Sequence, residues 1–271
     1  MERQAVGGEL KGLSQLCIFD SGRGSAGSGG APAPWPPAPP GGWARVDPMG
    51  ERALLLRWDS GMDRAANRSI QRLARALVDR ARQDSRLVAV VPGFDTLLVE
   101  FDPDAAAPEE VLGVVRWAAW SGVRGAPPQR IEIPVCYGGV WGPDLNAVAR
   151  RIGLSPETVV RLHASRPYHV YCLGFQAGFP YAGPLPDALV LPRRDHPAPR
   201  VAGGAVAVAG RQTGVYTRPG PGGWHVIGAT PWNLFQPHRE RPTLYQPGDE
   251  LWFRPVSAHR FQELAESGAP A

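Results

Sequence analysis

The sequence predicts an α+β protein made of two domains, and three observations carry this prediction. The 271 residues are 43% hydrophobic and 20% charged, which suits a chain with room for about two globular domains. Residues 43–124 give strand-like and helix-like segments in the order β-α-β-β-α, as in a small ferredoxin-like sandwich. Residues 125–260 hold many short strand candidates between glycines and prolines, which is typical of a β-barrel or a β-sandwich.

The first 42 residues are expected to form a disordered, low-complexity tail. They contain the Gly/Ser-rich run SGRGSAGSGG and then the proline-rich run APAPWPPAPPGG, neither of which can bury a core. Gly22 to Gly27 match the dinucleotide-binding pattern GxGxxG, but prolines follow where a helix should begin, so we exclude a cofactor loop. There is no basic-then-apolar secretory signal, and no apolar run approaches the ~20 residues of a membrane span, which favours a cytoplasmic protein.

The first domain, residues 43–124, is predicted from its periodicity. Apolar residues at helical spacing predict a helix from Arg64 to Arg82, with Asp63 as its N-cap. The polar residues Asp63 and Asn67 should lie close together, and helix capping and solvation are sufficient to explain both. The other elements expected here are a strand at Arg52–Trp58, a hairpin of Leu87–Val91 and Asp95–Phe101 around Pro92-Gly93, and a helix at Pro108–Trp120.

The second domain, residues 125–260, begins with a linker at Gly125–Gln129 and a strand at Ile131–Tyr137. Pro134 predicts that this strand is an edge or carries a bulge. Two short helices should follow, one at Pro143–Arg151 and one that starts after the N-cap Ser155 and ends near His163. The remaining strand candidates are Tyr168–Leu173, Ala188–Leu191, Ala205–Ala209, Gly214–Thr217, Trp224–Ile227 and Glu250–Arg254. Residues 261–271 are expected to be a C-terminal tail.

Charge and residue usage exclude several classes of function. Lys11 is the only lysine, so neither a Walker-type phosphate loop nor a Schiff-base lysine can exist beyond it. The net charge is +4, and the arginines are scattered among acids, which argues against nucleic-acid binding. Cys17, Cys136 and Cys172 form no CxxC pair, so a disulfide framework and a zinc knuckle are unsupported. The six histidines show no metal-binding pair on a helix face, and no metal site is expected.

The run from Gly174 to Gly223 combines glycine and proline with aromatics, arginines and one Gln-Thr pair. Such a stretch is typical of a shaped loop region that surrounds a ligand, whereas a flexible linker would lack GFPYAG and QTGVY. Five arginines in it could bind a small anion bidentately, although a solvated loop explains any single one: Arg193, Arg194, Arg200, Arg211 and Arg218. Arg200 is the strongest candidate because it follows proline at the entrance to a strand.

A second group of candidates is polar and aromatic. His163 could act as a general base, because its unperturbed pKa is near neutral, or it could cap the C-terminus of its helix. Gln212 and Thr213 are placed at the end of a small-residue strand, from which amides commonly contact ligands. The aromatic members of this group are Tyr216 and Trp224. We interpret the nearby Phe175, Phe179 and Tyr181 as core residues or as the wall of a pocket.

At these residues the chain resembles allophanate hydrolase subunit 1, also called the KipI family, which includes the B subunit of the bacterial 5-oxoprolinase. The resemblance covers roughly residues 43 to 256 in family order. It is carried by RVDPMGERALLLRW, VVPGFDTLLVEFDP, IPVCYGGVWGPDL, YHVYCLGFQAGFPYAG, AVAVAGRQTGVYTRPGPGGWHVIGATPWNLF and QPGDELWFRP. It implies a cyclophilin-like β-barrel after the ferredoxin-like domain.

The resemblance also implies an activity and partners. Family members pair with a second, cyclophilin-like subunit, and a third, catalytic subunit completes an enzyme that opens 5-oxo-L-proline to L-glutamate with ATP hydrolysis. ATP would carry Mg²⁺ as its counter-ion, without a dedicated metal site on the protein. Carried onto this sequence, the catalytic candidates are His163, Arg200 and Gln212, and the substrate- or nucleotide-binding candidates are Gly174, Phe175, Gly178, Phe179, Thr213, Tyr216 and Trp224.

Three positions depart from the family pattern, and two other functions remain open. Ala177 and Ala202 stand where the family usually has proline, and Ala205 stands where it usually has serine, so the substrate could be shifted or the activity reduced. A related activity, as an amidase or a carboxyltransferase, is therefore also compatible. The alternative from a different class is a protein-interaction regulator that inhibits a sensor histidine kinase, as the name-giving member of the family does. Proline isomerisation by the barrel would be a fold analogy alone.

Overall fold

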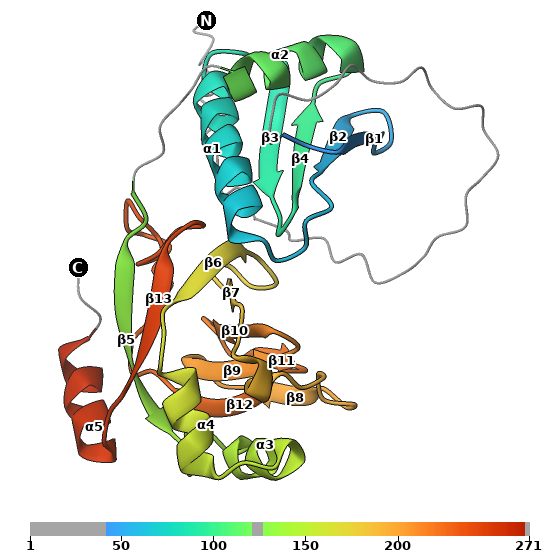
Figure 1. Ribbon diagram of the computed structural model, residues 1–271. Coiled ribbons are helices and arrows are strands. Elements are labelled where there is room, and N and C mark those ends of the chain that lie inside the picture. The colour runs from blue at the N-terminus through green and yellow to red at the C-terminus, as the bar shows by residue number, and fades with distance from the viewer. Residues whose placement is uncertain (1–41, 121–126, 269–271) are drawn as a thin grey trace, which may run out of the picture.

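The computed structural model describes residues 42–120 and 127–268, which form two domains (Figure 1). Nearly all of the predicted tail and the start of the predicted linker lie outside the described residues, as do Lys11 and Cys17. The first domain contains a four-stranded antiparallel sheet in the order β1-β2-β4-β3. Its elements are β1 (Arg45–Pro48), β2 (Ala53–Arg57), α1 (Arg64–Ala81), β3 (Leu87–Pro92), β4 (Thr96–Phe101) and α2 (Pro108–Trp120).

The first domain has the predicted split β-α-β arrangement. Both β2 and β3 run antiparallel to β4, which lies between them, so α1 connects two strands that are parallel to each other. The strand β1 was missed by the sequence analysis and adds to the free edge of β2. A four-residue strand that ends in proline is too short to show alternation, which explains the omission.

Periodicity explains how the helix α1 covers this sheet. Ile70, Leu73, Ala74 and Leu77 recur at helical spacing and are buried, and the Asp63 carboxylate caps the helix by accepting from the Ala66 amide at 2.7 Å. On the sheet, alternate residues of β2 and β4 face this helix and are fully or almost fully buried. One core therefore forms between the helices and one face of the sheet.

The second domain is a closed barrel of seven strands, in the order β10-β7-β6-β13-β5-β12-β9. This resolves the open choice between a barrel and a sandwich. One pair, β5 with β13, is parallel, and the other neighbours are antiparallel. The strands are β5 (Arg130–Tyr137), β6 (Tyr168–Leu173), β7 (Pro180–Gly183), β9 (Ala205–Ala209), β10 (Gln212–Val215), β12 (His225–Ala229) and β13 (Glu250–Pro255).

Helices and a separate ribbon surround the barrel. The helices are α3 (Leu145–Ile152) and α4 (Pro156–His163), and the ribbon pairs β8 (Ala198–Val201) with β11 (Gly220–Gly222). The Ser155 side chain caps α4 as predicted. Pro134 lies in the stretch of β5 that pairs only with β13, in agreement with the expected edge character.

One expectation for the second domain is wrong. The apolar run Ala188–Leu191 is not a strand, because a 3-10 turn forms at η1 (Asp187–Leu189), where the Leu189 amide bonds to the Pro186 carbonyl. Leu191 makes only an isolated bridge to Gly210, and the two leucines of the run fill the barrel core. The region expected to be a C-terminal tail begins inside a helix, α5 (Ala258–Ser267), which Ser257 caps, and Phe261 packs on Trp141 with ring centroids 5.4 Å apart.

The alternation of β9 divides the barrel wall into two apolar faces. Val206 and Val208 point into the barrel core, whereas Ala205, Ala207 and Ala209 point to the outside. Small side chains on the outer face leave room for large aromatic rings above them. A second apolar cluster forms there, and it carries most of the aromatic residues that the sequence analysis selected.

Candidate functional site

His163 lies in the barrel interior and is fully buried. Its Nδ1 atom is 2.7 Å from the Tyr137 hydroxyl and its Nε2 atom is 2.8 Å from the Thr213 hydroxyl. The ring stacks on Phe253 with centroids 4.7 Å apart. The imidazole does not cap its helix; only the His163 carbonyl bonds outward, where it accepts from the Tyr168 hydroxyl.

The hydrogen-bond chain through His163 has one arrangement that satisfies every member. Thr213 donates its hydroxyl hydrogen to the Ala207 carbonyl at 3.1 Å, so its oxygen accepts from the protonated Nε2 of His163. The unprotonated Nδ1 then accepts from Tyr137. Burial lowers the pKa of His163 to about 3 and raises that of Tyr137, so both groups are neutral at physiological pH.

An aromatic wall covers the outer face of β9, and we use this name for Phe179, Tyr181, Tyr216 and Trp224. The four side chains are almost fully buried. Phe179 meets Tyr216 and Trp224 edge to face, each with ring centroids 5.3 Å apart. The absence of a side chain at Gly214 is required here, because a Cβ would come within 2.7 Å of the Phe179 ring.

The turn at residues 174–179 places one aromatic ring on top of this wall in an unusual backbone conformation. Phe175 has φ +61° and is 54% exposed, and its ring contacts Phe179 with centroids 5.5 Å apart. A non-glycine residue in this region is strained and persists only where neighbours fix it. The Gly174 amide bonds to the Phe179 carbonyl at 3.1 Å, and the Tyr245 hydroxyl donates to the Gly178 carbonyl at 2.8 Å.

Arg194 and Arg211 of this run are engaged in ion pairs. Arg194 binds both oxygens of Asp144 at 2.9 Å, and Arg211 binds Asp187 at 2.7 Å. Arg200 is exposed on β8, and its side chain makes no hydrogen bond or ion pair with the described residues. Its neighbour Val201 is buried against the aromatic wall, so strand alternation turns Arg200 towards solvent.

The structure therefore separates the predicted residues into distinct groups. Phe175, Phe179, Tyr216 and Trp224 gather at the aromatic wall, with Gly174 and Gly178 shaping the turn above it. His163 and Thr213 form a pair inside the barrel, on the opposite side of the strand wall. Gln212 is half-buried at the start of β10, and Arg200 lies on the ribbon next to the aromatic wall with its side chain exposed to solvent.

The positions that depart from the family pattern include two that lie next to the aromatic wall. The Ala177 carbonyl accepts from the Thr217 hydroxyl at 2.8 Å, so the turn is held here without a proline. Ala205 is 3% exposed and belongs to the same cluster as Tyr216. A serine hydroxyl at this position would be buried against aromatic rings.

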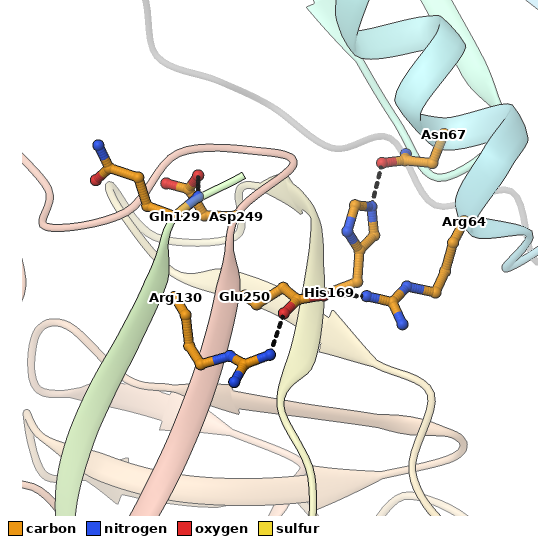
Figure 2. Close-up of polar contacts among 7 residues, drawn as sticks. All are labelled: Arg64, Asn67, Gln129, Arg130, His169, Asp249 and Glu250. Carbon is orange, nitrogen blue, oxygen red and sulfur yellow. Dashed lines mark hydrogen bonds and ion pairs between the residues drawn. The ribbon is translucent and has the colours of Figure 1, made fainter. Parts of the chain in front are cut away.

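A polar network that was not predicted from the sequence lies at the junction of the two domains (Figure 2). Asn67, which was explained by capping and solvation, is fully buried on α1. Its side-chain nitrogen donates to the carbonyls of Gly93, Phe94 and Tyr171 at 3.1, 2.8 and 3.2 Å. A signal for this network existed in the sequence, because Asn67 and Gln71 interrupt the apolar stripe of the helix.

These contacts fix the tautomer of His169 on β6. Since the Asn67 nitrogen is the donor, its oxygen accepts from His169 Nε2 at 2.9 Å, and Nδ1 is the unprotonated nitrogen. His169 is fully buried, and its Nδ1 atom has no partner among the described residues. Burial, helped by Arg64 and Arg68 and opposed by Glu250, lowers the pKa of His169 to about 4.

Ion pairs surround this histidine. Arg64 at the start of α1 binds Glu250 on β13, which also lies 3.5 Å from Arg130 on β5 (Figure 2). Asp249 accepts from the amides of Gln129 and Gln246, both at 2.9 Å, and so fixes the chain where it enters the barrel. The junction is thus both a structural contact and a concentration of charged groups.

Within residues 42–120 and 127–268, no three His, Cys, Asp or Glu side chains are grouped so that they could hold a metal ion. In those same ranges, every helix is too short or too polar to cross a bilayer.

Comparison with known proteins places both domains in one family. Residues 44–245 match the family described as carboxyltransferase domain, subdomain C and D. The chain is 42% identical to the 5-oxoprolinase B subunit of Escherichia coli O157:H7 over 215 residues, which cover 78% of this chain and 96% of that protein. It is 33% identical to the 5-oxoprolinase B subunit of Bacillus subtilis (strain 168) over 236 residues, 82% of this chain and 97% of that protein.

Solved structures show the same fold. The crystal structure of TTHA0988 is 41% identical with a TM-score of 0.68, and the match covers 76% of this chain. The chain spans 40% of the length of that protein. The urea amidolyase of K. lactis shares only the fold, with 18% identity, a TM-score of 0.65, and coverage of 82% of this chain and 15% of that chain.

Proposed function

We propose that this chain, which belongs to the family of carboxyltransferase-domain subdomains C and D, works in the cytoplasm as the B subunit of a multi-subunit 5-oxoprolinase. The observation that carries the proposal is similarity through both domains to proteins of that name. The match to the Escherichia coli protein covers 96% of its length at 42% identity. A shared barrel alone would support a fold, whereas similarity from end to end supports a shared role.

The proposed activity is the ATP-dependent opening of 5-oxo-L-proline to L-glutamate by the complete assembly. The lactam oxygen attacks the γ-phosphorus of ATP and ADP leaves, which turns a poor electrophile into one that water attacks. Addition of water breaks the ring C–N bond, whose nitrogen takes up a proton, and a second water releases phosphate. Developing negative charge in such a reaction needs fixed donors. Because Lys11 is the only lysine, arginines, amide side chains and backbone N–H groups are the donors that this chain can offer.

Within this proposal, the aromatic wall and the turn above it form a surface for ATP or for a partner subunit. Phe175 offers an exposed ring, and Arg200 on the neighbouring ribbon offers an unengaged guanidinium for phosphate oxygens. Mg²⁺ would accompany ATP as its counter-ion. A second cyclophilin-like subunit and a third subunit would complete the site, which explains why Arg200 faces solvent in the isolated chain.

His163 and Gln212 take different parts in this proposal. His163, with Thr213, keeps the strand wall in register from inside the barrel, and its chemical role is indirect as long as both ring nitrogens are bonded. Gln212 is the catalytic candidate whose side chain is available, because no hydrogen bond engages its amide in the described residues. Its amide can donate to a carbonyl or phosphoryl oxygen and can accept from a lactam N–H.

The test is reconstitution of the assembly. We would co-express the chain with candidate partner subunits and measure ATP hydrolysis that depends on added 5-oxo-L-proline. The proposal predicts turnover by the complete assembly, none when this chain is omitted, and loss of most turnover in Gln212→Ala with an unchanged unfolding profile. If the complete assembly shows no turnover, the proposal fails and inhibition of a sensor histidine kinase becomes the leading alternative.

A further inference from the structure

The register of the barrel aligns four positions in one row that faces the first domain. Glu250 on β13 pairs with His169 on β6, which pairs with Gly183 on β7. The pairing of Thr213 with Ala182 continues the row to Gln212 on β10, opposite Gly183. Directly paired residues project to the same face, with neighbouring strands ~4.8 Å apart. The row therefore places a carboxylate, an imidazole, a glycine without a side chain and an amide next to one another, from Glu250, His169, Gly183 and Gln212.

The loop at residues 58–62 leads from the first domain's core, where Trp58 packs, to Met62 beside this row, and it carries two left-handed backbone positions. Asp59 has φ +51° and Gly61 has φ +58°. The Met62 methyl group sits on Gly183, since a Cβ at that glycine would be 2.7 Å from Met62 Cε. Methionine is flexible and unbranched, so this side chain fills the space above the bare position without being fixed there.

Unpartnered polar atoms are concentrated around this loop. Trp58 Nε1, Ser60 Oγ, Arg64 Nε and His169 Nδ1 are buried and have no hydrogen-bond partner among the described residues. Buried polar atoms are almost always bonded, and exceptions call for a ligand, a water or a functional strain. Trp58 Nε1 and Arg64 Nε can only donate a hydrogen bond, and the Ser60 hydroxyl can donate or accept one. His169 Nδ1 can only accept, because the ring proton is on Nε2.

From this arrangement we propose that the junction is a binding site for a small amide or lactam, covered by the loop 58–62, with the Met62 side chain in the place of the ligand. An amide group supplies both missing partners, because its oxygen accepts from the donors of the loop and of Arg64 while its N–H donates to His169 Nδ1. The Gln212 amide at the far end of the row is the complementary group for a second polar substituent. The identity of the amide as 5-oxo-L-proline rests on the proposed function.

Three probes of the purified full chain separate the features of the ligand. 5-Oxo-L-proline has both the lactam and a carboxylate, 2-pyrrolidinone has the lactam alone, and L-proline has the carboxylate without the lactam carbonyl. Isothermal titration calorimetry should show binding of the first two and none of L-proline. Binding of L-proline equal to that of 5-oxo-L-proline would overturn an amide site in favour of a carboxylate site.

The Met62→Ala variant gives the sharpest test because it should increase binding. The ligand would no longer displace the methionine side chain, so the Kd for 5-oxo-L-proline should fall about five-fold. Met49→Ala is the matched control, since Met49 is 43% exposed in the first domain and should leave Kd unchanged. A Met62→Ala variant that binds no better than wild type, or no binding of any probe by either, would overturn the proposal.

Ser60→Ala and the reconstituted assembly distinguish this inference from the proposed function. Ser60→Ala removes one hydroxyl with little effect on folding and should raise the KM for 5-oxo-L-proline with kcat nearly unchanged. If the assembly turns over and both Met62→Ala and Ser60→Ala keep the wild-type KM, the junction site is wrong while the proposed function stands. If the chain binds the lactam as described but no assembly turns over, the site stands and the proposed function is wrong.

Discussion

The hydrogen-bonded surroundings of His163 and His169 differ in one respect that matters for function. Both imidazoles are fully buried, and burial lowers both pKa values. His163 has a partner on each nitrogen and lies among the rings of the barrel core. Among the described residues, His169 has a partner on Nε2 alone. The comparison indicates that a buried histidine is a candidate for ligand contact when one of its ring nitrogens has no hydrogen-bond partner within the protein.

The largest expected effect on stability comes from replacing His163, whose two ring nitrogens both have hydrogen-bond partners. His163→Ala removes a stacked ring and leaves the hydroxyls of Tyr137 and Thr213 without their partner, so the free energy of unfolding should fall by about 3–5 kcal/mol. Urea unfolding followed by circular dichroism measures this. A loss below about 1 kcal/mol would show that the chain of hydrogen bonds does not hold the barrel together.

The next largest effect on stability should come from Asn67, at the junction of the two domains. Asn67→Asp replaces a nitrogen that donates to three carbonyls with a carboxylate oxygen, which repels them, so unfolding should become easier by about 2–4 kcal/mol at neutral pH. This buried carboxyl should have a raised pKa, so the deficit should shrink as the pH falls. Ser69→Asp on the same helix is the matched control. An unchanged stability would mean that Asn67 does not join the domains.

Acid should weaken the junction through His169. Its pKa falls from 6.5 in the unfolded chain to about 4 in the folded one, so its contribution is fully present above pH 6.5 and is lost as the pH falls towards 4. The size of this contribution is roughly 3 kcal/mol. His169→Phe should flatten the stability profile over this range, measured by urea unfolding at several pH values. Equal slopes for wild type and variant would contradict this assignment.

The smallest expected effect is on the strained turn. Phe175→Gly relieves a left-handed backbone at φ +61° but loses the edge contacts of a half-exposed ring, so stability should change by less than about 1 kcal/mol. Activity of the reconstituted assembly should fall if the ring contacts nucleotide or a partner. A stability loss above about 2 kcal/mol would instead make Phe175 a core residue.

Periodicity predicted much of the fold, and local chemistry predicted the helix starts. Asp63 and Ser155 cap α1 and α4 as expected. The errors occurred where the signal is short or ambiguous. The β1 strand has four residues, the Ala188–Leu191 run is apolar without being extended, and α5 buries no residue.

The site was predicted less completely, for a reason of principle. The aromatic wall could be recognised because its residues are close in the sequence, between Phe179 and Trp224. At the junction, only the polar break at Asn67 and Gln71 in the helix stripe could be read from the sequence. Their partners could not, because Asn67 and His169 are 102 positions apart and only the register of the barrel aligns Gln212 with His169. Which nitrogen of a histidine lacks a partner is a property of tertiary packing, and no spacing rule carries it.

The most direct test of the comparison observes the two imidazoles together. Long-range ¹H–¹⁵N spectra of the histidine side chains report the protonation and hydrogen bonding of each ring nitrogen. Both rings should be neutral with the proton on Nε2, and added 5-oxo-L-proline should shift His169 Nδ1 while His163 stays unchanged. A ligand-induced shift at His163, or none at His169, would contradict the account.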